Sequence, residues 1–178
     1  GHPRLWLHGA SAGDLLSLAP MIERLRARFP AARIILSTIT DSGHLMATQR
    51  LKGSIDAVVY APWDLLGATR RAARALAGDL LVLEYTEIWP NLIAAVHRHG
   101  GKVALTNGRF SPAQVPRYRA LFGLVGNPLR TLDLLLMREP EEAERALSLG
   151  APPERVLVTG NTKFDALAPL AAAPEDEA

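Results

Sequence analysis

The stretch Leu5-Trp-Leu-His-Gly-Ala-Ser-Ala-Gly-Asp14 joins an apolar run to a turn of small residues, and an amphipathic segment follows as far as residue 29. A short continuous apolar run predicts a strand that is buried on both of its faces. After the turn, Leu15, Leu18 and Ile22 repeat at the spacing of one helix face. A strand, a tight turn and a helix begin a βαβ unit, so the stretch indicates a parallel α/β fold.

The same alternation of strand and helix continues along the chain. Strands are predicted at residues 5–8, 33–37, 57–60, 80–83, 103–106, 132–137 and 156–159. Helices are predicted at residues 14–29, 43–51, 65–77, 90–99, 116–124 and 141–149. We therefore predict an α/β fold over residues 1–165, with a doubly wound, mostly parallel sheet and helices on both faces. Residues 166–178 are rich in Ala, Pro and acidic residues, which predicts a linker.

Composition limits the kinds of function. Of the 178 residues, 48% are hydrophobic and 21% are charged, a balance typical of a folded domain. The formal net charge of +2 is too small to favour a nucleic-acid partner, so we predict none. The absence of cysteine excludes disulfides and thiolate sites, and the five histidines lack metal-ligand spacing. We therefore expect neither a metal nor another cofactor.

The first turn ends in a carboxylate. In an open parallel sheet, ligands bind beyond the carboxyl ends of the strands, which is where the prediction places Asp14. Asp14 either complements the helix dipole in the first helical turn or acts as a general base that deprotonates a sugar hydroxyl. The turn lacks G-x-G-x-x-G and the chain lacks G-x-x-x-x-G-K-[ST], which argues against a dinucleotide oxidoreductase and a P-loop enzyme.

Three later turns carry polar groups at the same predicted edge. Thr38 follows the second strand, and its hydroxyl either helps to cap the next helix or holds a phosphate or sugar. Glu87 follows the fourth strand, either in an exposed loop or as a group that orients a ligand or raises the pKa of a neighbouring acid. Arg109 follows the fifth strand and either pairs with Glu87 or binds an anion.

Two further groups of residues could meet anions. The last strand leads into a Gly-Asn turn and Lys163, which resembles a clamp for a phosphate or carboxylate. Arg70, Arg71 and Arg74 share one helical segment, which is either a solvated helix face or a site for anionic headgroups or sugar phosphates.

Six strings occur in the order found in one known family. They are His8-Gly-Ala-Ser-Ala-Gly-Asp14, Ser37-Thr-Ile-Thr-Asp-Ser-Gly43, Tyr60-Ala-Pro-Trp-Asp-Leu-Leu-Gly67, Thr86-Glu-Ile-Trp-Pro-Asn-Leu92, Asn107-Gly-Arg109 and Val158-Thr-Gly-Asn-Thr-Lys-Phe-Asp165. Together they resemble the amino-terminal domain of the 3-deoxy-D-manno-octulosonic acid (Kdo) transferases, and they cover nearly the whole chain as far as Asp165.

The resemblance implies one Rossmann-like lobe of a two-lobed GT-B glycosyltransferase. It implies transfer of Kdo from CMP-Kdo to a lipid A precursor in lipopolysaccharide biosynthesis, with inversion and without a required metal. In such an enzyme the amino-terminal lobe receives the acceptor and supplies the base, and a carboxyl-terminal lobe holds most of the CMP. We therefore expect the lipid A precursor, CMP-Kdo, a carboxyl-terminal lobe of the same protein and the membrane surface as partners, and the 178 residues alone to be inactive.

The resemblance also implies a location on the cytoplasmic face of the inner membrane. The protein would be peripheral there, or anchored through an amino-terminal segment outside the 178 residues.

Carried over position by position, the resemblance gives candidate site residues. Asp14 falls where the family has a catalytic glutamate, and Glu87 matches the second acid of the family's E-T-E-x-W-P-N string, whose first acid is replaced by Tyr85. Asp14 and Glu87 are thus the catalytic candidates. The candidates for binding the acceptor or another substrate are Ser11, Gly13, Thr38, Asn91, Arg109, Asn161 and Lys163.

Two alternatives stay open. The changes at Asp14 and Tyr85, together with a less polar segment at Met137-Arg138, favour a diverged glycosyltransferase lobe with another donor or acceptor. The other alternative is a non-catalytic sugar- or lipid-binding module that kept the fold and lost turnover.

Overall fold

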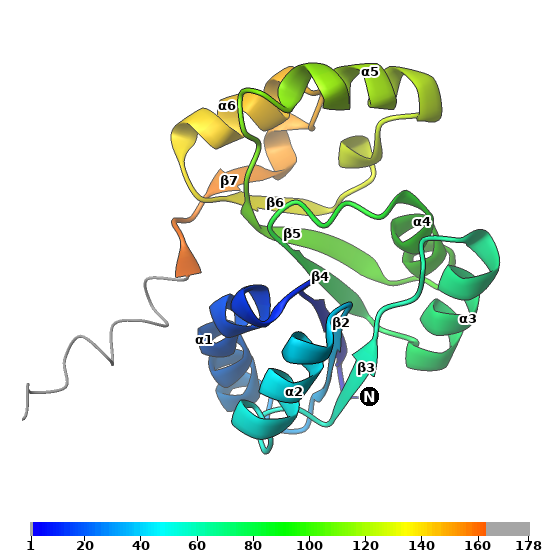
Figure 1. Cartoon of the computed structure of the whole chain (residues 1–178), viewed down its shortest axis with the longest axis vertical. Coiled ribbons are helices and arrows are strands. Elements are labelled where there is room, and N and C mark those ends of the chain that lie inside the picture. Colours follow the sequence, from blue (N-terminus) through cyan, green and yellow to red (C-terminus); the bar gives the residue numbers. More distant parts are fainter. Residues whose placement is uncertain (1, 163–178) are drawn as a thin grey trace, which may run out of the picture.

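Seven parallel strands form one sheet in a computed structural model that describes residues 2–162 (Figure 1). The strands lie in the order β3-β2-β1-β4-β5-β6-β7, so the chain builds outward from β1 on one side and then returns to build outward from β4 on the other. Their bounds are β1 Arg4–His8, β2 Arg33–Thr38, β3 Ala57–Tyr60, β4 Leu80–Glu84, β5 Lys102–Gly108, β6 Leu134–Met137 and β7 Val156–Val158.

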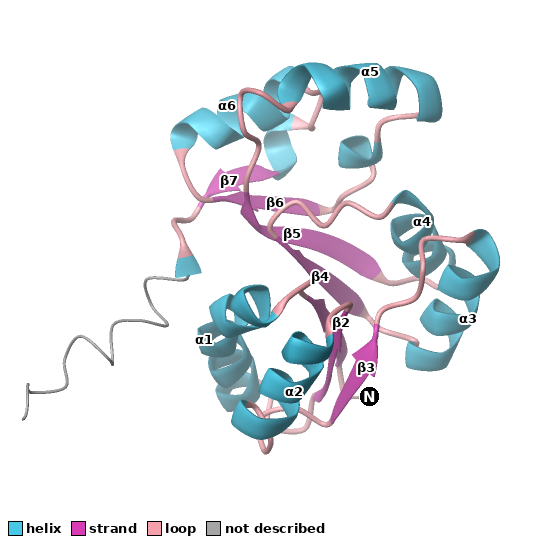
Figure 2. Cartoon of the chain, in the orientation of Figure 1, coloured by secondary structure: helices cyan, strands magenta, loops and turns pink. Residues whose placement is uncertain are grey.

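Helices cover both faces of the sheet (Figure 2). The helices are α1 Ala12–Arg28, α2 Asp41–Arg50, α3 Leu66–Leu76, α4 Pro90–Arg98, α5 Val115–Val125 and α6 Pro140–Ser148. One buried cluster joins the sheet to α1 and α2, and a second joins it to α3, α4, α5 and α6. The predicted doubly wound α/β fold is therefore confirmed.

The reversal of strand order places a crevice beside β1 and β4. These two strands are paired in parallel, with His8 opposite Leu83 near their carboxyl ends. Beyond those ends the chain turns to α1 on one face and to α4 on the other. A parallel sheet opens a ligand crevice where its connections diverge in this way.

Two central strands run further than the apolar pattern predicts. We expected β4 to end at residue 83 and β5 at residue 106, but they continue to Glu84 and Gly108. Glu84 is completely buried and accepts hydrogen bonds from Thr106 and Asn107 on the neighbouring strand. A buried carboxyl group is tolerated where partners satisfy its oxygens, so these polar residues extend the sheet instead of ending it.

The remaining elements agree closely with the predicted ranges. Each predicted strand and helix overlaps an observed one, and β3 has the predicted bounds. Pro90 lies in the first turn of α4, where a missing backbone N–H leaves no helical hydrogen bond unmade. The predicted linker at residues 166–178 lies outside the described residues. None of the helices between residues 2 and 162 has the length and apolar character needed to cross a bilayer.

Candidate functional site

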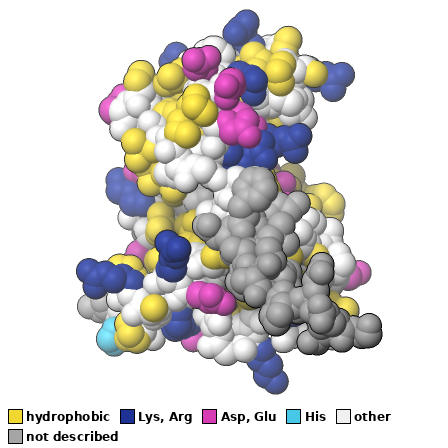
Figure 3. Space-filling view, turned by 90° about the vertical axis from the view of Figure 1, so that its left-hand side faces the viewer, with side chains coloured by type: hydrophobic (Ala, Val, Ile, Leu, Met, Phe, Trp, Pro, Cys, Tyr) yellow, Lys and Arg dark blue, Asp and Glu magenta, His cyan; other side chains and the backbone are white. Residues whose placement is uncertain are grey.

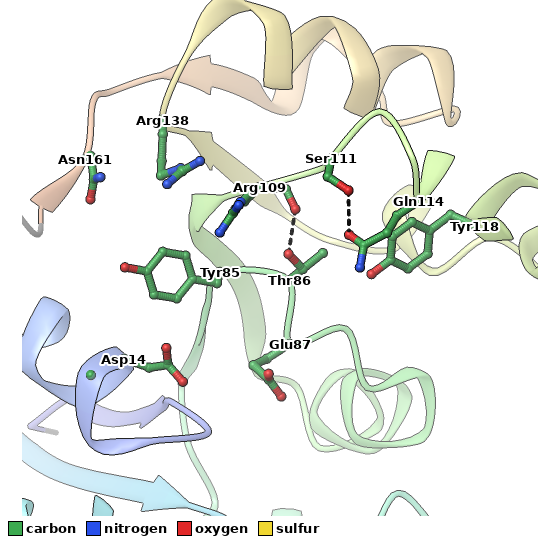
Figure 4. Close-up of a pocket in the computed structure, with 11 residues that line it drawn as sticks. Asp14, Tyr85, Thr86, Glu87, Arg109, Ser111, Gln114, Tyr118, Arg138 and Asn161 are labelled. Carbon is green, nitrogen blue, oxygen red and sulfur yellow. Dashed lines mark hydrogen bonds between the residues drawn. The ribbon is translucent and has the colours of Figure 1, made fainter. Parts of the chain in front are cut away.

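A cavity of about 910 Å³ opens at the carboxyl edge of the sheet (Figure 4). Its walls come from the segments that follow β1, β4, β5, β6 and β7, which lie far apart in the sequence. The lining residues are Gly13, Asp14, Tyr85, Thr86, Glu87, Arg109, Ser111, Gln114, Tyr118, Arg138 and Asn161.

The cavity has a carboxylate side and a guanidinium side. Figure 4 shows Asp14 and Glu87 on one side, and Arg109 and Arg138 on the other. The carboxylates can accept hydrogen bonds or a proton from hydroxyl groups, and guanidinium groups bind phosphates and carboxylates. This arrangement suits a ligand that carries both hydroxyl groups and an anionic group.

Asp14 lies both at the start of α1 and in the cavity wall, the positions that its two alternative roles require. Its Oδ2 accepts hydrogen bonds from the backbone N–H of Ser11, at 2.8 Å, and from the Ser11 hydroxyl, at 3.0 Å. These bonds close the start of α1, as expected of an acid in the first helical turn. Asp14 also lines the cavity, and its Oδ1 makes no hydrogen bond to any described residue. One oxygen is therefore held by the helix start, and the other remains for a ligand.

Glu87 has a similar division between its two oxygens. Its Oε2 accepts a hydrogen bond from Trp89 Nε1 at 2.9 Å and lies 3.7 Å from His8 Nε2. Burial raises the pKa of Glu87, but the neighbouring His8 ring and the hydrogen bond from Trp89 outweigh it and hold the pKa below its ordinary value. Glu87 is therefore an ionised carboxylate at the cavity wall.

The turn that presents Glu87 has an unusual backbone. Tyr85 adopts a φ of 55°, in the left-handed region that non-glycine residues seldom occupy. Its hydroxyl lies 3.1 Å from the Ser17 hydroxyl of α1, and its backbone N–H donates to the Thr106 carbonyl. Contacts on both sides thus hold Tyr85 in this conformation between β4 and α1.

Arg109 is available to a ligand. The sequence left open an ion pair between Arg109 and Glu87, but the residues described in the structure contain no such pair. Its backbone carbonyl accepts a hydrogen bond from Thr86, which fixes the start of the loop while the exposed guanidinium reaches the cavity. The anion-binding alternative is the one that this geometry favours.

Several lining residues were not predicted from the sequence. Arg138 follows β6 and forms an ion pair with the buried Glu142 of α6 through two of its nitrogens. Ser111, Gln114 and Tyr118 lie in and before α5. The Arg-x-x-x-Glu spacing of the ion pair is a signal that could have identified Arg138 as a fixed side chain, because Arg138 lies just before the start of α6 and Glu142 lies in its first turn.

Glu84 was also missed. No site role was predicted for Glu84, yet it is buried beside the cavity with its two oxygens bonded to Thr106 and Asn107. Burial, together with the negative charge of Asp14, raises the pKa of Glu84 to about 7 against the effect of these bonds. Glu84 therefore lies beneath the cavity as a partly protonated group near neutral pH.

Thr38 and Asn91, two predicted binding residues, lie outside the cavity lining. The Thr38 side chain is fully buried, and its hydroxyl donates to the Ala10 carbonyl of the first turn at 2.8 Å. This bond gives both polar groups a partner. The Asn91 side chain donates to the carbonyl of Asp64 at 2.7 Å and so ties the start of α4 to the preceding loop. Both residues support the site instead of lining it.

The other predicted residues divide into three groups. Gly13 and Asn161 line the cavity, as a binding role requires. Ser11 does not line the cavity, but it donates two hydrogen bonds to the carboxylate of Asp14, which does. Lys163 lies outside the described residues.

The described residues suggest no metal centre. Between residues 2 and 162 there is no group of three or more His, Cys, Asp or Glu side chains placed to hold a metal ion.

Solved structures of similar shape include UDP-N-acetylglucosamine 2-epimerases. The chain superposes on UDP-GlcNAc 2-epimerase from Neisseria meningitidis bound to UDP-GlcNAc with a TM-score of 0.65 and 15% identity, covering 92% of this chain and 48% of that one. For UDP-N-acetylglucosamine 2-epimerase from Rickettsia bellii the TM-score is 0.66 at 10% identity, covering 96% and 48%. At this identity the likeness shows the fold alone, which is one Rossmann-like lobe of the GT-B type.

Sequence comparison is more specific. A protein from Chlamydia trachomatis serovar D named 3-deoxy-D-manno-octulosonic acid transferase is 32% identical over 162 residues, which are 90% of this chain and 37% of the relative. The Haemophilus influenzae protein of the same name is 27% identical over 164 residues, 90% of this chain and 38% of the relative. This chain thus spans little more than a third of the length of these relatives.

The family match covers almost the whole chain. Residues 1–166 match the family model described as 3-deoxy-D-manno-octulosonic-acid transferase (kdotransferase). The match includes all of the residues that line the cavity. The chain therefore belongs to the Kdo transferase family.

Proposed function

We propose that this chain is the acceptor-binding, base-supplying lobe of an inverting glycosyltransferase that moves Kdo from CMP-Kdo to a lipid A precursor in lipopolysaccharide biosynthesis. The observation that carries the proposal is one cavity at the ligand edge of a GT-B lobe with Asp14 and Glu87 on one side and Arg109 on the other. The acceptor would offer hydroxyl groups to the carboxylates, and a phosphate on the acceptor or the carboxylate of Kdo would meet Arg109.

In this mechanism Asp14 is the general base. Its unbonded Oδ1 takes the proton of an acceptor hydroxyl while that oxygen forms a bond to the anomeric carbon of Kdo. The bond between the anomeric carbon and CMP breaks, and CMP leaves with the electron pair. Attack from the side opposite CMP inverts the anomeric carbon. Glu87 positions the acceptor through its ionised carboxylate, and Lys163 is proposed to bind an anionic group of either substrate.

The donor site is proposed to lie in a second lobe. The chain spans 37% of the length of its Chlamydia trachomatis relative, and its likeness to the epimerase structures covers about half of each solved chain. The cavity is open at the sheet edge, where such a lobe would close over the substrates. For this reason the 178 residues alone are proposed to be inactive. Independently, the family resemblance leads us to propose that the transfer needs no metal.

A membrane surface is proposed as the place where the lipid acceptor is met, on the cytoplasmic face of the inner membrane. Near the start of α3, Trp63, Leu65 and Leu66 are 81%, 67% and 58% exposed, and Arg70 and Arg71 follow on the same helix. Exposed apolar side chains next to basic ones suit an anionic bilayer surface. By contrast, the face seen in Figure 3 has hydrophobic, basic and acidic side chains interspersed.

The function is tested by transfer assays on the full-length parent protein with CMP-Kdo and a lipid A precursor. We expect Asp14→Asn to lower kcat by at least about 100-fold, because it removes the general base. We expect Asp14→Glu to keep more activity than Asp14→Asn, although a shift of about 1 Å in the carboxylate can cost on the order of 100-fold. The matched control is Asp41→Asn, which changes an acid in the first turn of α2, away from the cavity.

Two other outcomes would change the proposal. Unchanged turnover in Asp14→Asn would remove Asp14 as the base. If the parent used another activated sugar but not CMP-Kdo, beside a Kdo transferase that works in the same assay, the diverged transferase would be favoured. That alternative rests on Asp14 in place of the family glutamate and on Tyr85 in place of its first acid. Acceptor binding without turnover of any donor would favour a non-catalytic module.

A further inference from the structure

His8 is a buried polar residue directly behind the cavity. It ends β1, is completely buried, and has its Nδ1 2.9 Å from the Ser37 hydroxyl of β2. Its Nε2 is the one buried side-chain nitrogen or oxygen among the described residues that has no hydrogen-bond partner. A buried polar atom without a partner is costly, so this nitrogen calls for an explanation.

The contacts of Ser37 indicate which nitrogen of His8 carries the proton. The indole Nε1 of Trp6, which can only donate, lies 2.7 Å from the Ser37 hydroxyl oxygen. The buried Ser37 hydroxyl has no second acceptor among the described residues besides His8 Nδ1. The Ser37 hydroxyl and His8 Nδ1 both have a partner for their hydrogen-bonding atoms only when Ser37 donates to Nδ1. A neutral imidazole then carries its proton on Nε2.

Glu87 lies on the Nε2 side of His8. Its Oε2 is 3.7 Å from His8 Nε2 and is already bonded to Trp89 Nε1. The Trp89 and His8 rings pack edge to face, with ring centres 6.1 Å apart and an angle of 83° between their planes. A shift of less than about 1 Å would therefore bring His8 Nε2 into hydrogen-bond distance of the carboxylate.

We propose that His8 is a positioning residue for Glu87. Ser37 sets the neutral Nε2–H tautomer of His8, and this Nε2–H donates a hydrogen bond to Glu87 Oε2. Because His8 and Trp89 both bind Oε2, the other carboxylate oxygen, Oε1, is the one that receives a sugar hydroxyl. The 3.7 Å separation closes when the ligand draws Glu87 into place, since catalytic hydrogen bonds are often long without substrate and shorten in the complex. The role of Glu87 toward a sugar hydroxyl rests on the proposed function, but the hydrogen-bond chain from Trp6 to Glu87 does not.

The tautomer can be measured on the 178-residue chain without substrate. Long-range ¹H–¹⁵N spectra of the histidine rings distinguish a protonated Nε2 from a protonated Nδ1, and the His8 ring is assigned by its loss in His8→Gln. We expect the neutral Nε2–H form in the unmodified chain and a mixture of tautomers in Ser37→Ala, where Nδ1 loses its donor. His99, which is exposed, is the internal reference. A protonated Nδ1 in the unmodified chain would overturn the proposal.

A matched pair of variants tests the contact with Glu87. His8→Gln keeps a donor near the Nε2 position, whereas His8→Asn keeps only a group that can meet Ser37. We expect the pKa of Glu87, followed by the ¹³C signal of its carboxyl group, to stay near its original value in His8→Gln. In His8→Asn it should rise by roughly 1 unit, which corresponds to the loss of a hydrogen bond to a charged group. Equal titration of Glu87 in both variants would contradict the proposed contact.

Other groups could affect that titration. The titratable or charged groups near Glu87 are His8 on β1, Tyr118 on α5, and Asp14, Tyr85, Arg109 and Arg138, which line the same cavity. The variant Tyr118→Phe therefore serves as a control for the pair. Because these measurements use no sugar, a failure of Kdo transfer in the parent protein would leave them intact, and a failure here would leave the base role of Asp14 intact.

Discussion

Glu84 and Glu87 are only three residues apart, yet the protein treats the two carboxyl groups in opposite ways. Glu84 ends β4, is completely buried, and is bonded by Thr106 and Asn107 of β5, and its pKa is raised to about 7, mainly by burial. Glu87 borders the cavity, and contacts with His8 and Trp89 overcome its partial burial and lower its pKa. Surroundings, not residue type, thus make one acid a buried structural group and the other an ionised carboxylate at the cavity wall.

The largest expected effect comes from removing the buried acid. In Glu84→Ala, Thr106 and Asn107 lose their acceptor and a small cavity opens between β4 and β5. At pH 5 we expect the free energy of unfolding to fall by roughly 3–5 kcal/mol, from two unpaired buried donors plus the lost packing. Urea unfolding followed by circular dichroism measures this change. A loss below about 1 kcal/mol would mean that Glu84 does not hold the two strands together.

The pH dependence of stability should follow from the raised pKa of Glu84. Because the folded protein keeps this proton to higher pH than the unfolded chain does, the contribution of Glu84 is fully present below pH 4.5. It is lost as the pH rises through about 7, by about 3 kcal/mol in total. We expect Glu84→Gln, which has no proton to lose, to remove this part of the decline. If the urea midpoint changed with pH in the same way in the unmodified protein and in Glu84→Gln, Glu84 would not be the group that causes the decline in stability.

A smaller effect is expected at the cavity wall. In Glu87→Gln the side-chain oxygen can still accept from Trp89, so the free energy of unfolding at pH 7 should fall by less than about 1 kcal/mol. The sign with pH is opposite to that of Glu84: the contribution of the ionised Glu87 is present above pH 4.5 and is lost as the pH falls through its lowered pKa. Urea unfolding at pH 7 and at pH 3 checks both points. A loss at pH 7 as large as that of Glu84→Ala would give Glu87 a structural role instead of a ligand-binding one.

Much of the fold could be predicted from local patterns. The apolar runs identified the seven strands, and the turn after β1 was correctly placed at the ligand edge. Asp14 and Glu87 were predicted as site residues because each follows a strand of a parallel sheet, and both line the cavity. The same rule predicted Thr38, whose hydroxyl instead meets the carbonyl of Ala10 in the neighbouring turn. Position after a strand indicates the edge of the sheet, but it does not determine the direction of a side chain.

The sequence by itself determined the strand–helix period, the parallel sheet and the edge where polar residues gather, because these depend on patterns within a few residues of one another. Only the tertiary structure decided which acids are buried and which face the cavity. Glu84 is satisfied by residues 22 and 23 positions later, and Glu87 lies beside His8 of a strand nearly 80 positions earlier. Such partners meet only when strand order and register are set, and it is their contacts that fix the charge of each group.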